Sequence, residues 1–179
     1  MISGGGALLA AWLAPIAAGG IAAWDAAGPP DLLPPPPALT QRIDRIVVYK
    51  HHRRLIAYRG GEALKGYSIG LGFAPEGDKS RQGDGRTPEG LFRIDQRNGQ
   101  SQYHLSLGID YPQPEDVRRA AELGVSPGGD IFIHGQPNQR KGAPDLRGDW
   151  TAGCMAVSDA GIEELWRVVP LGTEVEILP

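Results

Sequence analysis

The sequence predicts a mainly β domain, a sandwich or barrel-like mixed sheet with two peripheral helices. Short runs of β-branched and aromatic residues recur after residue 42, and turn residues separate them. Glycine and proline are abundant, with 26 and 16 copies, as expected of a fold with many turns and loops. A chain of 179 residues is long enough for one domain with a sizeable core.

The first 42 residues differ in character from the rest of the chain. Residues 4–24 are uncharged and rich in Ala, Leu, Ile and Gly, so residues 1–25 are interpreted as either a secretory signal peptide or a membrane anchor. Residues 26–42 form a proline-rich linker, which we expect to be stiff, solvated and unable to pack as a core element. The folded domain is expected at residues 43–179, with membrane contact only through the N-terminal segment.

The strands follow from the hydrophobic pattern. Residues 45–50 and 53–59 predict a hairpin, with His51 and His52 in its turn and without a functional role. Further strands are expected at residues 66–73, 90–95, 103–109, 131–135 and 174–178.

Two helices are predicted between these strands. The first spans residues 114–124, with proline at its start and Glu115 four residues before Arg119, a spacing that suits an ion pair. The second spans residues 158–170, with Ser158 as its N-cap. Its apolar side chains share one face at helical spacing: Ile162, Leu165, Trp166 and Val169.

Charge and cysteine content exclude several classes of function. The chain has 18 basic and 21 acidic residues, which argues against a nucleic-acid partner, because such proteins usually carry a basic stripe. A single cysteine cannot form an intrachain disulfide or a thiolate-only metal site. The four histidines show no metal-ligand spacing relative to it, so no metal site is expected.

That single cysteine, Cys154, lies in the sequence TAGC shortly before the second helix. A thiol becomes a useful nucleophile when a base or a positive field favours its thiolate. His134, at the end of the strand 131–135, is the candidate base, and a nearby backbone carbonyl can fix its ring. The small residues Ala152 and Gly153 let backbone N–H groups approach an oxyanion. The competing interpretation is a cysteine and a histidine that only pack.

The order IHG, a gap, then Thr-x-Gly-Cys resembles the signature of the L,D-transpeptidase catalytic domain, also called YkuD-like. Thr151, Gly153 and Cys154 match its second part, and His134 matches its first. The opening hairpin, the strand ending in glycine and the GDGRTPEG turn also resemble this family, so the resemblance covers residues 44–178.

The resemblance implies a site and a substrate. Cys154 would be the attacking thiolate, His134 its base, and the Gly135 carbonyl would orient the histidine, while amides of Gly153 and Cys154 would form the oxyanion hole. The substrate would be peptidoglycan stem peptides, attacked beside diaminopimelate to give a thioester, without any cofactor. The location would be the bacterial cell envelope, in the periplasm. The protein is expected to act as a monomer.

Two positions depart from the common family pattern. Ala152 stands where histidine is usual, and Ala156 stands where an arginine usually follows the cysteine. The sequence around them is similar to that of a divergent YafK-type branch of the family. Some members of this branch are murein amidases that release a wall-attached protein. Hydrolysis by water is therefore the first hypothesis. The alternatives are transfer to an amine, a non-catalytic wall-binding module, and an exported β protein with a structural cysteine. A wall-attached lipoprotein is a candidate partner.

The enzyme and structural-cysteine hypotheses differ in the reactivity and pKa that they predict for the Cys154 thiol. An enzyme predicts rapid alkylation and a depressed thiol pKa, whereas a structural cysteine predicts a buried, unreactive thiol.

Candidate substrate contacts are Arg86, in the turn 83–90, His104 and Thr151. The alternative role for Arg86 is an ion pair with a neighbouring acidic residue instead of a substrate contact. His104 and Ser106 are expected on one strand face lining the cleft, and Trp150 is expected either to wall the cleft or to pack.

Overall fold

The computed structural model describes residues 37–179, and the predicted signal peptide or anchor and most of the linker lie outside the described residues. Among residues 37–179, no helix has the length and apolar character needed to cross a membrane. The end of the predicted linker differs from expectation. Leu39 packs against the hydrophobic core, and its backbone N–H is bound by the Glu164 carboxylate. The chain is therefore already anchored to the domain before the first strand.

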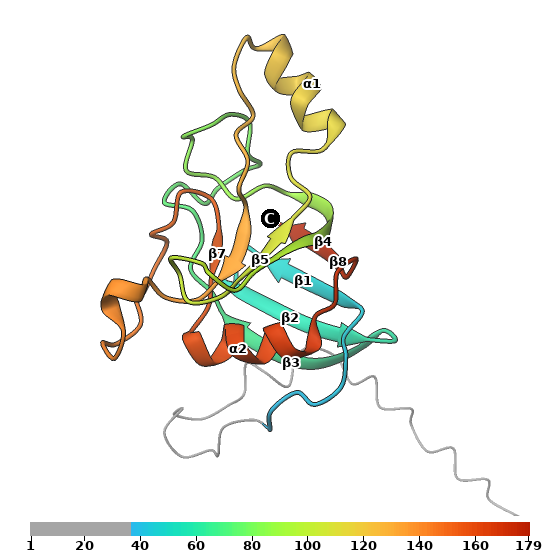
Figure 1. Cartoon of the computed structure of the whole chain (residues 1–179). Helices are drawn as coiled ribbons and strands as arrows, with labels where there is room; N and C mark the ends of the chain where they lie inside the picture. Colours follow the sequence, from blue (N-terminus) through green and yellow to red (C-terminus); the bar gives the residue numbers. More distant parts are fainter. Residues whose placement is uncertain (1–36) are drawn as a thin grey trace, which may run out of the picture. The chain divides into compact units, whose positions relative to one another are not determined.

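A single mixed sheet of eight strands dominates the described residues (Figure 1), and this confirms the predicted mainly β class. Its spatial order is β3-β2-β1-β8-β4-β5-β6-β7. The strands are β1 (Arg45–Tyr49), β2 (Arg54–Arg59), β3 (Glu62–Ser68), β4 (Gly90–Asn98), β5 (Ser106–Ile109), β6 (Phe132–His134), β7 (Met155–Ala156) and β8 (Glu174–Leu178).

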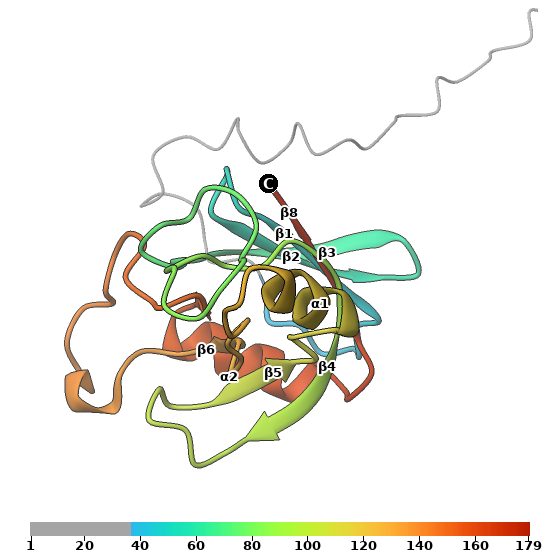
Figure 2. The same ribbon diagram turned by 90° about the horizontal axis from the view of Figure 1, so that it is seen from above.

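The pairing of the strands explains how the sheet curls. β1 and β2 form the predicted antiparallel hairpin, and β8 lies parallel to β1. β4 pairs with β8 through its first residues and with β5 through its last, with an irregularity in register between Ile94 and Gln96. Such an irregularity bends a strand and increases its twist. β4 therefore carries the sheet from its first half into the half that contains β5, β6 and β7 (Figure 2).

Helix α2 (Asp159–Val168) contacts β5 and β6. The Ser158 side chain caps it by accepting a hydrogen bond from the Gly161 N–H at 3.0 Å, as predicted. Ile162 and Leu165 are fully buried, whereas Trp166 is only partly buried under the Arg97 guanidinium, 4.1 Å from its ring. The side chains with the largest buried volume form one core: Ile46, Leu55, Leu71, Ile94, Leu107, Ile133, Met155, Ile162, Leu165, Ile177, Val48 and Val157.

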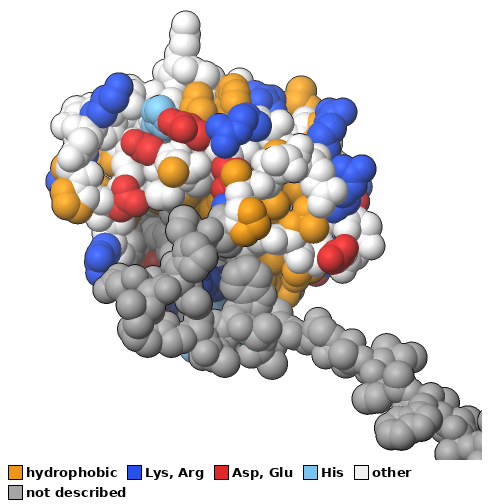
Figure 3. Space-filling model, turned by 90° about the horizontal axis from the view of Figure 1, so that it is seen from below, with side chains coloured by type: hydrophobic (Ala, Val, Ile, Leu, Met, Phe, Trp, Pro, Cys, Tyr) orange, Lys and Arg blue, Asp and Glu red, His pale blue; other side chains and the backbone are white. Residues whose placement is uncertain are grey.

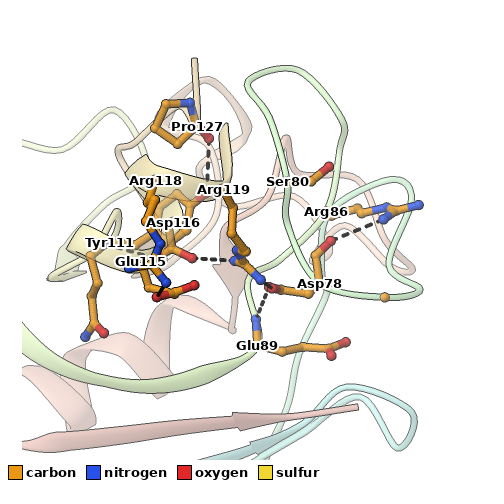
Figure 4. A network of polar contacts seen from close by, with 12 residues as sticks. Asp78, Ser80, Arg86, Glu89, Tyr111, Glu115, Asp116, Arg118, Arg119 and Pro127 are labelled. Atoms are coloured by element: carbon orange, nitrogen blue, oxygen red, sulfur yellow. Dashed lines mark hydrogen bonds and ion pairs between the residues drawn. The ribbon is translucent and has the colours of Figure 1, made fainter. Parts of the chain in front are cut away.

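Helix α1 (Pro114–Glu122) forms where it was predicted, but its expected ion pair between Glu115 and Arg119 does not. Glu115 pairs with Arg118 instead of Arg119. Arg119 binds Asp116 at 2.5 Å and Asp78 at 2.6 Å (Figure 4). The reason is tertiary: the Asp78 carboxylate, on a distant loop, draws the Arg119 side chain away from Glu115.

Two strand predictions were wrong in their extent. The strand expected at 103–109 begins only at Ser106, because His104 has a φ of +64° and so leaves the extended conformation. The strand expected at 66–73 ends at Ser68. Beyond it, Gly70 and Gly72 form isolated bridges to Ala156 and Thr151.

Replacing Ser158 with alanine should lower the free energy of unfolding by about 1 kcal/mol, because the cap hydrogen bond to the Gly161 N–H is lost. Urea unfolding followed by circular dichroism measures this. The matched control is Ser158→Asp, which keeps an acceptor at the N-terminus of α2 and should retain stability. Equal losses in both variants would show that the cap does not stabilise α2.

Candidate active site

The pairing of β6 with β7 brings His134 beside the segment that Cys154 directly precedes. Ile133 lies opposite Met155 and His134 opposite Ala156, in a parallel register. Ile133 and Met155 are fully buried in the core. Because side chains alternate along a strand, His134 belongs to the opposite face, and Cys154 directly precedes β7.

The His134 ring is buried and has a defined tautomer. Its Nδ1 lies 2.7 Å from the Gly135 carbonyl oxygen, the contact expected from the sequence. A carbonyl can only accept, so Nδ1 carries the proton and Nε2 keeps a free lone pair. Burial lowers the pKa of His134, and the Gly135 carbonyl opposes this only in part. The imidazole is therefore neutral and available as a base.

Two aromatic rings enclose His134. The Tyr103 ring is tilted against it, with centroids 4.5 Å apart, and the Trp150 ring meets it edge-on at 5.7 Å. Trp150 thus contacts the candidate base directly, which combines the two roles considered for it. Tyr103 was missed from the sequence, because the stretch around it was taken as part of a strand. Its only signal was an aromatic residue at the end of that predicted strand.

The Cys154 thiol is held away from His134. Its Sγ donates to the Asp130 carbonyl oxygen at 3.4 Å, and no hydrogen bond joins it to His134 within the described residues. Burial raises the pKa of the Cys154 thiol, and the Asp130 carboxylate adds to this, while the Phe132 backbone N–H and the Lys79 ammonium act in the opposite direction. The raised thiol pKa differs from the depressed pKa expected of an enzyme and agrees with the structural-cysteine hypothesis on this point, because burial exceeds the stabilisation that the thiolate receives.

Thr151 braces the turn that carries the cysteine. Its hydroxyl donates to the Cys154 carbonyl oxygen at 2.8 Å and accepts from the Gly153 N–H at 3.1 Å. The side chain is buried and its hydroxyl makes these two internal bonds, while its substrate contact stays a prediction. The same bond occupies the Gly153 N–H, which was expected in the oxyanion hole. The Cys154 N–H has no partner among residues 37–179 and remains a candidate donor.

Gly153 is required by its surroundings. Its φ is +140°, and a Cβ there would lie 2.7 Å from the Arg86 carbonyl oxygen and 3.2 Å from the Ile131 side chain. Contacts of 2.7 Å with a backbone atom leave no room for a side chain. The glycine therefore lets the loop of Arg86 pack against the cysteine turn.

That loop, residues 78–89, is organised around the Asp84 carboxylate. Lys79 binds it at 2.8 Å. The backbone N–H groups of Ser80, Arg81 and Arg86 donate to it at 2.8, 3.1 and 3.1 Å. Burial alone would raise the pKa of Asp84, but Lys79 and these three donors outweigh it and hold the pKa at about 2. The carboxylate is ionised throughout the physiological range and fixes the loop.

Arg86, a predicted substrate contact, turns its side chain onto this loop. Its guanidinium donates to the Asp78 carbonyl oxygen at 3.2 Å, as Figure 4 shows. The alternative of an ion pair with a neighbouring acid is not formed among the described residues. The Asp78 carboxylate instead binds Arg119 of α1 and the Glu89 N–H. The loop is thereby joined to α1.

The prediction that His104 and Ser106 lie on one strand face was wrong. His104 lies before β5, and its Nε2 is 2.8 Å from a Glu163 carboxylate oxygen on α2. The Ser106 hydroxyl is buried against Ser101. His104 nevertheless lies close behind the site, since a Cβ on Gly135 would be 3.1 Å from the His104 Cβ. It supports the backbone beside His134 rather than facing Cys154.

No group of three or more His, Cys, Asp or Glu side chains in residues 37–179 is placed to hold a metal ion. Figure 3 shows both signs of charge, together with apolar side chains, on the face viewed there. The described site offers a thiol, a neutral imidazole and backbone donors.

Three comparisons relate the chain to known proteins. The family model of the L,D-transpeptidase catalytic domain, YkuD, matches residues 43–177. YafK of Escherichia coli (strain K12), which is assigned as an L,D-transpeptidase, is 30% identical over 131 residues, covering 69% of this chain and 46% of YafK.

Solved structures show the same fold. The helical cell shape determining protein Pgp2 of Campylobacter jejuni (K307A mutant) superposes with a TM-score of 0.58 at 24% identity, covering 77% of this chain and 47% of that one. Bd1075 of Bdellovibrio bacteriovorus superposes with a TM-score of 0.54 at 27% identity, covering 80% and 53%. The chain thus spans about half the length of these relatives.

Gly153→Ala should lower the free energy of unfolding by about 3 kcal/mol, because it combines an unfavourable φ with a clash against the Arg86 carbonyl. The matched control is Gly142→Ala, at a φ of +83° with nothing within 4 Å. It should cost only about 1 kcal/mol. Urea unfolding of both variants tests this, and equal losses would contradict the packing described for Gly153.

The alkylation rate of Cys154 should rise with pH and reach its inflection above the ordinary cysteine value of about 8.5. The reason is that a thiol with a raised pKa stays protonated, and unreactive, through the neutral range. Iodoacetamide labelling followed by mass spectrometry measures the profile without interference, since the chain has 1 cysteine. The urea-unfolded chain is the control and should return to the ordinary value. A plateau near neutral pH in the folded protein would indicate a preformed thiolate instead.

Proposed function

The chain belongs to the L,D-transpeptidase catalytic domain (YkuD) family, and on that premise we propose that it is a peptidoglycan-modifying enzyme with Cys154 as its nucleophile. One observation carries the proposal: a buried, neutral His134 with a free Nε2 lies on the strand beside the cysteine. The substrate is a stem peptide of the bacterial cell wall, attacked at a carbonyl beside diaminopimelate. We propose that residues 1–25 act as a signal peptide or membrane anchor and that the domain works in the periplasm.

The reaction begins from a neutral pair. Because burial lowers the pKa of His134 and raises that of Cys154, thiol and imidazole are both uncharged at rest. The bound substrate displaces the thiol from the Asp130 carbonyl and brings Sγ toward Nε2. His134 then takes the thiol proton as Sγ attacks the substrate carbonyl carbon, as a general base does for a serine nucleophile. The Cys154 N–H stabilises the oxyanion.

The tetrahedral intermediate then collapses to a thioester. The bond from the carbonyl carbon to the leaving nitrogen breaks, and His134 returns its proton to that amine. Water enters next: His134 accepts a proton from it, the hydroxide adds to the thioester carbonyl, and the C–S bond breaks. The products are a carboxylate on the stem peptide and a thiol that regains its proton.

The acceptor distinguishes two versions of this enzyme. We favour water, and hence release of a wall-attached protein or peptide such as a lipoprotein, because of the likeness to YafK-type proteins around Ala152 and Ala156. If an amine instead resolved the same thioester intermediate, the protein would be a transpeptidase. A non-catalytic wall-binding module is the other alternative, and the ready base beside the thiol counts against it. We propose that the folded domain acts as a monomer.

Ala156 stands where arginine is common in the family, and the packing around it excludes a long side chain. Ala156 is 2% exposed, and its N–H and C=O both bond to Gly70 at 2.8 Å. A side chain as long as arginine does not fit this packed pairing. Substrate carboxylates are therefore held by other groups than in the common family form.

Purified protein incubated with defined muropeptides and muropeptide–peptide conjugates should release the conjugated peptide and leave a new carboxylate, identified by mass spectrometry. Cys154→Ser should reduce turnover by about 1,000-fold or more, and His134→Gln by about 100-fold or more. His51→Gln is the matched control, since His51 is exposed in the β1–β2 turn, and it should keep full activity.

The products decide among the alternatives. New crosslinks would favour the transpeptidase over the hydrolase. Full turnover by Cys154→Ser would show that Cys154 is not the nucleophile. Binding of muropeptides without any product would favour the wall-binding module.

A further inference from the structure

The Trp150 ring forms part of the cover over the His134 imidazole. His134 is 3% exposed, and the two rings that contact it, Tyr103 and Trp150, are themselves partly exposed to solvent. These two rings therefore lie between the imidazole and the surrounding water. A displaced Trp150 ring would admit water to His134 and favour its charged form. The position of this ring thus decides whether the base stays neutral.

The indole of Trp150 is not held in place through its own polar atom. Its Nε1 is buried and has no hydrogen-bond partner within residues 37–179. The ring packs on Gly70, where an added Cβ would lie 3.3 Å from Nε1. A buried donor without a partner costs free energy. The backbone on either side of Trp150 therefore has to keep the ring in this position.

That backbone is fixed to Leu71 on both sides of Trp150. The Leu71 N–H donates to the Asp149 carboxylate at 3.0 Å, and the Leu71 carbonyl oxygen accepts from the Thr151 N–H at 3.0 Å. Leu71 is fully buried in the core, so it is a rigid reference for both contacts. The contact after Trp150 joins two backbone groups, whereas the contact before it depends on the Asp149 side chain.

Arg53 holds the Asp149 side chain in place. Its Nε lies 3.2 and 3.1 Å from the two carboxylate oxygens, and its Nη2 lies 2.8 Å from one of them. Its Nη1 donates to the carbonyl oxygens of Lys50 and His51 at 2.6 and 3.3 Å. The φ of Arg53 is +50°, a conformation that residues other than glycine rarely adopt. The β1–β2 turn therefore presents this guanidinium to Asp149 in a defined orientation.

The effect expected of this ion pair is on position more than on global stability. Exposed ion pairs contribute little to stability, and the Arg53 side chain is 38% exposed. Asp149 is more enclosed, at 18%, and its carboxylate binds the Leu71 N–H as well as the guanidinium. The carboxylate is thereby held from two directions, directly before Trp150 in the chain.

We propose that the Arg53–Asp149 ion pair is a positioning pair, which holds the Trp150 ring over His134 and keeps water away from the catalytic base. This inference rests on the proposed function, in which His134 is that base. It connects the β1–β2 turn to a site that lies far from it in the sequence.

The test is an NMR titration of the His134 ring protons in the full chain, with the resonance identified by its loss in His134→Gln. Asp149→Ala should raise the pKa of His134 by about half a unit or more, toward the ordinary value of about 6.5, because the loosened Trp150 ring admits water. Asp145→Ala is the matched control, since Asp145 is an exposed aspartate of the same loop, and it should leave the titration unchanged.

The sign of the shift separates positioning from a direct effect of charge. If the Asp149 carboxylate acted on His134 through its own charge, its removal would lower the pKa of His134, and a downward shift would contradict the proposal. Trp150→Leu should raise this pKa as well. The double variant Asp149→Ala/Trp150→Leu should then titrate like Trp150→Leu alone, because Asp149 acts through the ring. Additive shifts would contradict the proposal.

Arg53→Asn gives an independent result if Asp149→Ala does not fold. Asparagine tolerates the positive φ of this position, and the contact between Asp149 and the Leu71 N–H can remain. The pKa of His134 should again rise in this variant. An unchanged titration in Arg53→Asn would overturn the proposal.

The titration requires no muropeptide. The proposed function can therefore fail, through absent turnover in the wild type, while the role of the ion pair stands. Where turnover is present, the acid limb of its pH profile should move upward with the pKa of His134. Normal turnover together with an unaltered His134 titration would remove the role of the ion pair alone.

Discussion

The site depends on a very short parallel pairing between β6 and β7. Only two residue pairs define it, Ile133 with Met155 and His134 with Ala156. Its stability comes from the core, since Ile133 and Met155 are fully buried, and from Gly70, which bonds to both backbone groups of Ala156. A pairing so short would not form alone. It is fixed because one face is packed in the core, which leaves His134 on the opposite face and Cys154 directly before β7.

The chemistry of the site is set by burial more than by direct contact. Burial keeps His134 neutral and Cys154 protonated, so the resting pair carries no charge in a poorly solvated place. The polar groups that fix the surroundings are themselves satisfied: Gly135 holds the histidine, Thr151 braces the cysteine turn, and Asp84 organises the facing loop. The cysteine enzyme that we propose would resemble a serine hydrolase in its proton transfer, with the base acting only when the substrate arrives.

Local sequence signals predicted the elements well, and contacts between distant segments less well. The hairpin, both helices and the positions of His134, Gly135 and Cys154 followed from patterns within a few residues of each position. β7 could not be predicted, because two residues carry no periodicity. The position of His104 was wrong because its positive φ depends on the turn around it, and Tyr103 was missed for the same reason. The enzyme hypothesis predicted a low thiol pKa, and the burial that raises it is a tertiary property that the sequence does not show.

The central claim is that Cys154 becomes acylated with the help of His134. Intact-protein mass spectrometry of the enzyme, quenched in acid shortly after mixing with a defined muropeptide, tests it most directly. The account predicts an added mass equal to the acyl part of the stem peptide, located on Cys154 after digestion, and strongly reduced in His134→Gln. Turnover of the muropeptide without any adduct on Cys154, or an adduct that forms equally fast in His134→Gln, would contradict it.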